Sequence, residues 1–429
     1  MTSANLTHIL IVGAGAAGLM AGRELARAGK RVTIIEARDR CGGRIDPLPA
    51  EIFGYPAEGG AEFVHGAAPV TRAVMREAGL ALAPRVGTRW STRGGGALSP
   101  DTFALPDAGR FYQALGEVTA DLPVGEFLDT HFAGPQYTAL RRSIIRTVEG
   151  YDAADPRRMS TLALREEWMA RDDGEHGRLA KGYGALIDYL AAECRRHGAA
   201  LHLGAAVTAI EESGGGIAAS CRNGAVFAGD AAILTVPLPL LSEIALPPAA
   251  RQQAAAAADI GYGNVVKILF RFATKWWAGH GDHDLGDLSF LVSDAIVPTW
   301  WTQHPQEQPV LTGWYAGPKA DTVSSLTEAE LVDMGLASLA AIFDLPGDRL
   351  RGGLVASRAI NWGNDPFARG AYSYATPSTR AAHSVLKDTD RSAVFFSGEA
   401  LYAGADMGTV EAALAIGADT AQAILRAAP

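Results

Sequence analysis

The sequence predicts an α/β protein of two domains, and three observations lead to this fold class. A short β-rich run at His8–Val12 is followed by helical spacing from Leu19 to Ala28 and by a second β-rich run that begins at Arg31. A strand–helix–strand unit of this kind implies a parallel sheet. The chain has 429 residues, which exceeds the size at which a single hydrophobic core usually keeps growing.

The later elements alternate between helical and strand-like patterns. Gly29 supplies a C-cap for the first helix, and residues 69–190 look mostly helical. Thr327 opens a further helix with capping-box spacing to Glu330, and a last helix is expected over residues 409–428. The strand-like stretches between and beside these helices lie in residues 200–237, 264–315 and 393–399.

Composition and charge narrow the class of protein. The formal net charge of −9 argues against nucleic acid or anionic lipid as a partner, because both are themselves negatively charged. The three cysteines, Cys41, Cys194 and Cys221, lie far apart and indicate neither a disulfide framework nor a metal site. No apolar run reaches the length of a membrane span, and the N-terminal run lacks a basic leader. We therefore expect a cytoplasmic protein without metal, and the sequence does not predict an oligomeric state.

The glycines after the first strand predict a Rossmann-like dinucleotide site. Gly13 permits the tight turn, Gly15 lets the backbone approach a pyrophosphate, and Gly18 allows close packing of the helix. The helix N-terminus favours the negative charge of the phosphates. Glu36 ends the second strand, where a carboxylate is placed to bind a ribose hydroxyl. This motif by itself does not separate NAD from FAD.

Two further stretches, "EARDRCGGRI" (residues 36–45) and "AEGGAEFVHG" (residues 57–66), resemble the flavin-containing amine oxidase family. The resemblance implies FAD as cofactor, because the RxGGR element of that family lies along the FAD pyrophosphate and ribityl chain. The residues that it places there are Arg38, Gly43 and Arg44. Those that it places at or near the isoalloxazine are Gly59, Gly60, Ala61 and Glu62.

The C-terminal stretch "FFSGEALYAGADMGTVEAAL" resembles the closing strand and flavin-directed helix of the same family. The resemblance implies that Glu399 meets the ribityl or phosphate region. Gly408, Thr409 and Val410 would then face the flavin from a helix N-terminus. Val207 matches the residue that binds adenine through its backbone. Because this motif contains no cysteine, we expect FAD to be bound non-covalently.

The residues expected at the reacting centre are Lys267, Trp362, Tyr372 and His65. Lys267 is the one lysine of the strongly apolar stretch "GYGNVVKILFRF", where burial is costly without a partner or a role. The family resemblance gives its lysine the task of holding a water against the flavin, and places Trp362 and Tyr372 beside the ring. His65 matches a substrate-channel histidine of some polyamine oxidases and is a candidate base, with Glu62 as a neighbouring acid.

These motifs are closest to the polyamine oxidase and histone lysine demethylase branch of the family. The implied activity is oxidation of an amine, with polyamines favoured, by hydride transfer to flavin N5. The resulting imine hydrolyses to an aldehyde or ketone, and O2 is reduced to H2O2. Three alternatives remain open at this point: an FAD-dependent carbon–carbon desaturase of the protoporphyrinogen oxidase type, an L-amino acid oxidase, and a flavin-binding protein without turnover.

The interleaved patterns predict that the chain passes between the two domains several times. The first is a Rossmann-like FAD-binding domain, and the second is an α+β substrate-binding domain. The predicted ranges are 1–75, 190–260 and 352–429 for the FAD-binding domain, and 76–189 and 261–351 for the substrate-binding domain. The active site is expected between them.

Overall fold

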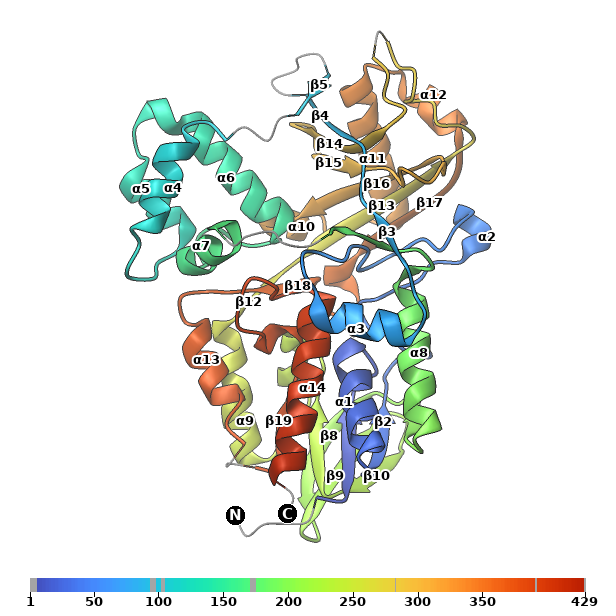
Figure 1. Ribbon diagram of the computed structural model, residues 1–429, viewed down its shortest axis with the longest axis vertical. Coiled ribbons are helices and arrows are strands. Elements are labelled where there is room, and N and C mark those ends of the chain that lie inside the picture. The colour runs from blue at the N-terminus through green and yellow to red at the C-terminus, as the bar shows by residue number, and fades with distance from the viewer. Residues whose placement is uncertain are drawn as a thin grey trace.

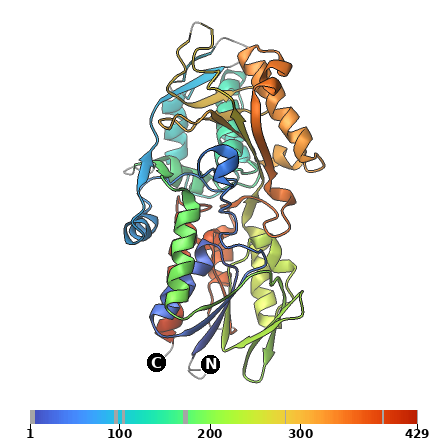
Figure 2. The same cartoon turned by 90° about the vertical axis from the view of Figure 1, so that its right-hand side faces the viewer.

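The computed structural model describes residues 6–92, 98–101, 105–169, 175–281, 283–389 and 392–427. Figure 1 shows an elongated molecule with one sheet in its lower half, a second sheet in its upper half and a group of helices beside the upper sheet. Both ends of the chain lie at the bottom, and the view turned by 90° agrees (Figure 2). The predicted α/β architecture of two domains is confirmed.

The lower half is built on a parallel five-stranded sheet. Its strands, in spatial order, are β19 (Val394–Phe396), β11 (Ala231–Leu234), β1 (His8–Val12), β2 (Arg31–Ile35) and β7 (Ala200–His202). Alternate side chains of β1 enter two different cores, Ile9 and Ile11 on one face and Leu10 and Val12 on the other. The sheet is therefore covered on both faces, as parallel sheets usually are.

Helices cover one face of this sheet and a small antiparallel sheet covers the other. The helices are α1 (Ala16–Arg27), α8 (Gly182–Arg196) and α14 (Val410–Ala427). The antiparallel sheet consists of β8 (Val207–Ser213), β9 (Gly216–Cys221) and β10 (Val226–Gly229). The strand–helix–strand unit that the glycine motif predicts is β1–α1–β2, and β1 pairs in parallel with β2.

The upper half is a seven-stranded sheet. Its order is β17 (Leu354–Asn361), β13 (Val265–Phe272), β16 (Val310–Ala316), β15 (Thr299–Trp301), β14 (Leu288–Ser293), β4 (Thr88–Thr92) and β5 (Ser99–Pro100). On β13, Val266, Ile268 and Phe270 pack into the core under α11 (Glu328–Phe343). Because side chains alternate along a strand, Lys267 points from the opposite face.

Helix α11 confirms its predicted start. Thr327 Oγ1 accepts a hydrogen bond from the Glu330 backbone N–H, and the Glu330 carboxylate accepts one from the Thr327 backbone, so both halves of the capping box are present. The short helix α12 (Gly347–Gly352) follows it before β17. Figure 1 shows α11 and α12 on the outer side of the upper sheet.

The stretch predicted to be mostly helical is only partly so. Its helices are α3 (Pro69–Glu77), α4 (Ala108–Gly116), α5 (Val124–His131), α6 (Thr138–Tyr151) and α7 (Thr161–Met169). The strands are β4 and β5 of the upper sheet, and the pair β3 (Leu82–Pro84) and β6 (Gly177–Leu179). Strands this short carry too little periodicity to stand out in a sequence.

Short elements join the two halves. Strands β12 (Gly261–Gly263) and β18 (Tyr372–Tyr374) pair with each other, and β12 leads directly into β13. The remaining short helices are α2 (Ala50–Phe53), α9 (Pro248–Ala254), α10 (Pro318–Asp321) and α13 (Thr379–Leu386).

Within the described ranges, no helix combines the length and apolar character that a membrane crossing requires.

The division into domains stays a prediction, and the packing of α8 favours one change to it. Leu186, Ile187 and Leu190 of α8 belong to the same core as α1. A boundary between residues 189 and 190 would cut this helix, so we propose a boundary before α8 instead.

Candidate active site

The turn after β1 has the geometry that its glycines predict. Gly13 adopts a φ of +108°, a conformation that glycine tolerates best. A Cβ on Gly18 would lie 2.0 Å from the Gly13 carbonyl oxygen, so helix α1 can approach the turn only without a side chain there. No side chain caps α1 at Gly15. The first backbone N–H groups of the helix are therefore available to an anion such as a pyrophosphate.

Glu36 and Arg38 form the next part of the wall. The Glu36 carboxylate accepts hydrogen bonds from the backbone N–H of Ala14 at 2.7 Å and of Arg38 at 2.8 Å. These bonds fix it at the end of β2, beside the glycine turn. The Arg38 guanidinium forms an ion pair with Asp365 at 2.5 Å, so a segment that precedes β18 also closes over this region.

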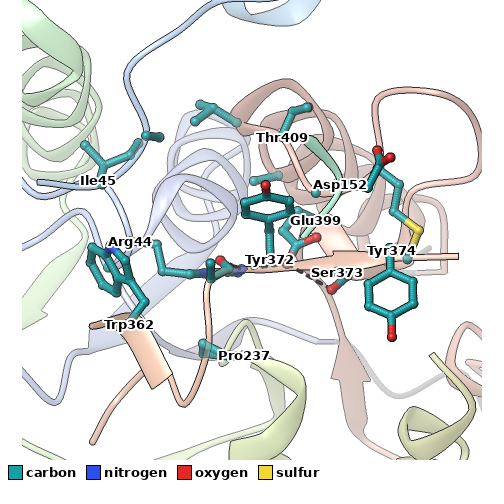
Figure 3. Close-up of a pocket in the computed structure, with 18 of the residues that line it drawn as sticks. Arg44, Ile45, Asp152, Pro237, Trp362, Tyr372, Ser373, Tyr374, Glu399 and Thr409 are labelled. Carbon is teal, nitrogen blue, oxygen red and sulfur yellow. Dashed lines mark hydrogen bonds and ion pairs between the residues drawn. The ribbon is translucent and has the colours of Figure 1, made fainter. Parts of the chain in front are cut away.

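Arg44 and Glu399 join the N-terminal and C-terminal segments. The guanidinium donates to Glu399 Oε1 at 2.7 Å and to the Ala371 carbonyl at 2.8 Å, and the Ser373 hydroxyl also donates to Glu399 Oε1. Figure 3 shows Ser373 and Glu399 beneath Tyr372, with Arg44 to one side. Glu399 Oε2 is buried and has no hydrogen-bond partner among the residues of the described ranges. A hydroxyl-rich ligand such as a ribityl chain would supply that partner.

Gly59 and Gly60 pack closely against Trp362 and the backbone near Arg44. A Cβ on Gly60 would lie 1.8 Å from the Arg44 carbonyl oxygen and 3.1 Å from the Trp362 ring. The Trp362 indole donates a hydrogen bond to the Gly59 carbonyl at 3.1 Å. The close packing of this segment against residue 44 and Trp362 therefore depends on the absence of a side chain at Gly60.

The N-terminus of α14 faces the same region. Gly408 has a φ of +86°, and the Thr409 hydroxyl accepts a hydrogen bond from the Ala412 backbone N–H at 3.1 Å. Thr409 is thus the N-cap of this helix, directly before Val410. In Figure 3, Thr409 is drawn above the Tyr372 ring, at the start of the helix.

Lys267 is completely buried and ion-paired. Its Nζ donates to Glu62 Oε2 at 2.8 Å and to the Gly60 carbonyl oxygen at 3.0 Å. Burial alone would raise the pKa of Glu62, but Lys267 and Arg178 outweigh burial and lower that pKa to about 2. Glu62 is therefore ionised at neutral pH and is the counterion of Lys267. This charge state does not fit the role of a proton-donating acid that the sequence suggested for Glu62.

A row of aromatic rings continues from this ion pair. Trp301 lies 5.5 Å from Lys267 Nζ and 5.6 Å from Trp314, and Trp314 stacks on Tyr372 at 6.5 Å with an interplanar angle of 20°. The Tyr372 hydroxyl donates to the Tyr151 carbonyl at 2.6 Å, and the Trp314 indole donates to Gly150. The end of α6 therefore fixes the orientation of both rings.

Asp152 lies beyond Tyr372, on the side away from Trp362 (Figure 3), and Glu167 lines the same cavity. Burial raises the pKa of Asp152 well above its ordinary value and that of Glu167 to about 7. The pKa of Tyr372 is also raised, first by burial and then by Asp152. His65 is at another part of the wall, with its ring 5.8 Å from that of Tyr151.

One cavity of about 1020 Å³ brings these groups together. Gly18 and Gly59 do not line it, and their role is to let the backbone pack closely. The predicted residues that line it are Gly13, Gly15, Glu36, Arg38, Gly43, Arg44, Gly60, Ala61, Glu62, His65, Val207, Lys267, Trp362, Tyr372, Glu399, Gly408, Thr409 and Val410. No cysteine lines it, and the part of the chain that the structure describes holds no cluster of three metal-ligating side chains.

Several lining residues were not predicted from the sequence. They are Trp301, Trp314, Asp152 and Glu167, and Arg178 is added by its contact with Glu62. The two tryptophans sit in strands whose inward face the sequence does not reveal. Asp152 directly follows α6 and Glu167 lies in α7, and neither belongs to a motif that the sequence analysis identified.

The glycine turn, the acidic residue after β2 and the deep cavity define a dinucleotide-binding protein. A model of the family described as flavin containing amine oxidoreductase matches residues 16–425. The chain therefore belongs to this family of flavin-containing amine oxidoreductases, and FAD is its cofactor, as predicted.

Individual relatives fall in the predicted branch. Lysine-specific histone demethylase 2 of Homo sapiens is 25% identical over 91% of this chain and 50% of its own length. Polyamine oxidase 4 of Oryza sativa subsp. japonica is 27% identical over 91% of this chain and 83% of its own. The chain thus spans about half the length of the histone demethylases that it matches.

Solved structures share the fold. A putrescine oxidase with bound putrescine superposes with a TM-score of 0.79 at 21% identity, covering 98% of this chain and 99% of that one. Cyclohexylamine oxidase from Brevibacterium oxydans IH-35A gives a TM-score of 0.79 at 20% identity, with coverage of 98% and 99%. Similarity at this level of identity establishes the architecture.

Proposed function

We propose that this protein is an FAD-dependent amine oxidase. The observation that carries the proposal is the position of Lys267, completely buried in the cavity wall beside Glu62 and the aromatic row of Trp301, Trp314 and Tyr372. An ammonium group is costly to bury without a use. Membership of the flavin-containing family supports the same reading.

The residues present fit FAD. The glycine turn and Glu36 would hold the ADP half, Val207 the adenine, and the free Oε2 of Glu399 a hydroxyl of the ribityl chain. The N-terminus of α14 would favour negative charge at the flavin edge. Bound FAD would supply the hydride acceptor for the amine carbon and the route by which two electrons reach O2, with H2O2 as the product. Because no cysteine lines the cavity, we propose non-covalent binding.

The wall of the cavity suits an amine that enters as a cation and reacts as a neutral base. Aromatic faces such as Trp314 and Tyr372 attract a cation without forming a fixed ion pair. We assign Lys267 the task of holding the water that hydrolyses the imine to an aldehyde or ketone. We also propose that His65, which lines the cavity, takes a proton from the incoming amine.

A polyamine-like substrate is favoured by the carboxyl groups beyond Tyr372. Asp152 and Glu167 line the same cavity as Lys267 and form a hydrogen bond with each other. A second ammonium group of a long amine would favour the ionised form of this carboxyl pair and would bind to it. A monoamine has no second ammonium group to place beside this pair. Relatives named polyamine oxidase support the same preference.

The test is an anaerobic titration of the purified yellow protein with separate amines. We expect spermidine, spermine or a diamine to bleach the flavin at lower concentration than a monoamine of equal length. Asp152→Asn should raise the polyamine concentration needed for half-maximal bleaching by at least about tenfold. The concentration needed for the monoamine should change by less than about twofold. Readmission of air with detection of H2O2 then tests O2 as the acceptor.

The remaining outcomes decide between the alternatives. Bleaching by L-amino acids alone would favour an amino acid oxidase, and bleaching by an apolar polyene would favour a desaturase. A yellow protein that no compound bleaches would contradict turnover.

A further inference from the structure

A network of buried hydrogen bonds, here called the Glu62 clamp, surrounds Glu62, and three of its donors were not predicted from the sequence. Three side chains donate to a single oxygen, Glu62 Oε1: Arg178 at 2.7 Å, Trp301 at 3.0 Å and Gln303 at 3.0 Å. The other oxygen, Oε2, accepts from Lys267 at 2.8 Å. The donors come from β6, β15 and the residues after β15, and Lys267 comes from β13.

The division of these contacts fixes the direction of the carboxylate. With Oε1 held by three donors, the carboxylate cannot rotate without breaking several buried hydrogen bonds. Oε2 is therefore held against Lys267. An Nζ group has three N–H donors, and two of them are used by Glu62 and Gly60. No third partner for Nζ lies among the residues that the structure describes, so the last donor faces the cavity that Lys267 lines.

We propose that Glu62 is a positioning residue, which keeps Lys267 charged and directs its remaining N–H toward the cavity. This inference rests on the proposed function, because it assigns Lys267 a place at the reacting centre. The charges of the cluster agree with it. Lys267 and Arg178 are two buried cations, and Glu62 is the anion that both contact. Without it, burial and the repulsion of Arg178 would both favour a neutral Lys267.

The other titratable groups around the cluster do not replace Glu62. Burial raises the pKa of Glu58 to about 8, so its carboxyl is uncharged at neutral pH, and its Oε1 accepts from the Tyr183 backbone N–H. The pKa of Tyr55 is also raised by burial, so the phenol stays neutral. Glu58 does not line the cavity and makes no hydrogen bond with Lys267 among the described contacts, which makes it a matched control.

The experiment compares Glu62→Gln with Glu58→Gln in the FAD-loaded protein. The two changes are isosteric, and each removes one buried carboxyl group. Because only the neutral amine reacts with acetic anhydride, labelling of Lys267 at neutral pH, read by peptide mass spectrometry against the exposed Lys181, reports its charge. We expect at least about a tenfold increase in Glu62→Gln, as the loss of a contacting opposite charge implies, and less than about twofold in Glu58→Gln.

A second readout does not depend on access of the reagent. In Glu62→Gln the visible spectrum of the bound flavin should change with pH as Lys267 loses its proton, and the double variant Glu62→Gln/Lys267→Met should not show this change. Unchanged labelling together with a spectrum that does not respond to pH would overturn the proposal. If Glu62→Gln fails to retain flavin, Gln303→Leu is the variant to use. It keeps the charge of Glu62 but removes one hydrogen-bond donor to Oε1. Labelling of Lys267 should then rise by about twofold.

Neither readout requires turnover. A positive result with no amine that bleaches the flavin would therefore sink the proposed function and leave the role of Glu62 intact. If neither readout changes in a protein that oxidises amines, the proposed function stands and the proposed role of Glu62 is wrong.

Discussion

At the scale of single residues, the buried carboxyl groups near Lys267 differ because their contacts differ. Glu62 meets two cations and two neutral donors, and its pKa falls to about 2. Glu58 has one backbone donor, its Oε2 has no partner among the described residues, and burial raises its pKa to about 8. The two residues are four positions apart in the sequence, yet at neutral pH Glu62 is ionised and Glu58 is uncharged.

Glu58 makes the stability of the protein depend on pH. Its folded pKa of about 8 lies above its ordinary value of 4.5, so its contribution is full below the ordinary value and is lost as pH rises through 8. In this window the loss approaches about 1.4 kcal/mol per pH unit. Glu58→Gln should therefore gain stability over the wild type between about pH 5 and pH 8, measured by denaturant unfolding. A difference that is equal at both pH values would contradict this.

At the scale of elements, the close contact between α1 and the preceding turn sets the position of the helix N-terminus. Gly18 faces the Gly13 carbonyl oxygen, and Gly417 of α14 packs against the backbone of Ala17 in a similar way. Glycines in both helices thus allow α1 and α14 to approach each other and the turn. The two helix N-termini that line the cavity depend on this packing.

Gly18→Ala should displace α1 and weaken FAD binding, because the new Cβ would meet the Gly13 carbonyl oxygen at 2.0 Å. Overpacking of this kind costs typically about 1–3 kcal/mol. Equilibrium dialysis should give a loss of FAD affinity of at least about tenfold. The control is Gly109→Ala in α4, where no atom lies within 4 Å of the new Cβ. Equal affinity in both variants would rule out the proposed packing role.

At the scale of the whole molecule, the cavity joins both halves. The lower half contributes the glycine turn, Glu36 and Val207 to the cavity wall. The upper sheet contributes Lys267 and the tryptophans of β15 and β16, and α6 contributes its last residue, Tyr151. A ligand that fills the cavity contacts elements from both sheets. Its binding should therefore stabilise the molecule as a unit.

Removal of FAD should lower the midpoint of thermal unfolding by several degrees, and added FAD should restore it. A ligand at 100 times its dissociation constant contributes about 2.7 kcal/mol. The shift should grow with the logarithm of the FAD concentration, as followed by calorimetry. A midpoint that is independent of FAD would show that the cavity does not bind it.

The sequence by itself determined the strand–helix–strand unit, the glycine turn and most of the predicted residues that line the cavity. Those features depend on short-range rules, because a φ of +108° at Gly13 or a capping box at Thr327 is decided within a few residues. The aromatic row and the Glu62 clamp were decided by tertiary structure alone. Trp301 and Arg178 lie more than 100 residues from Glu62, and only the strand order and the alternation of side chains bring them into contact with it. Trp314 is equally distant in the sequence and joins the row through its contact with Trp301.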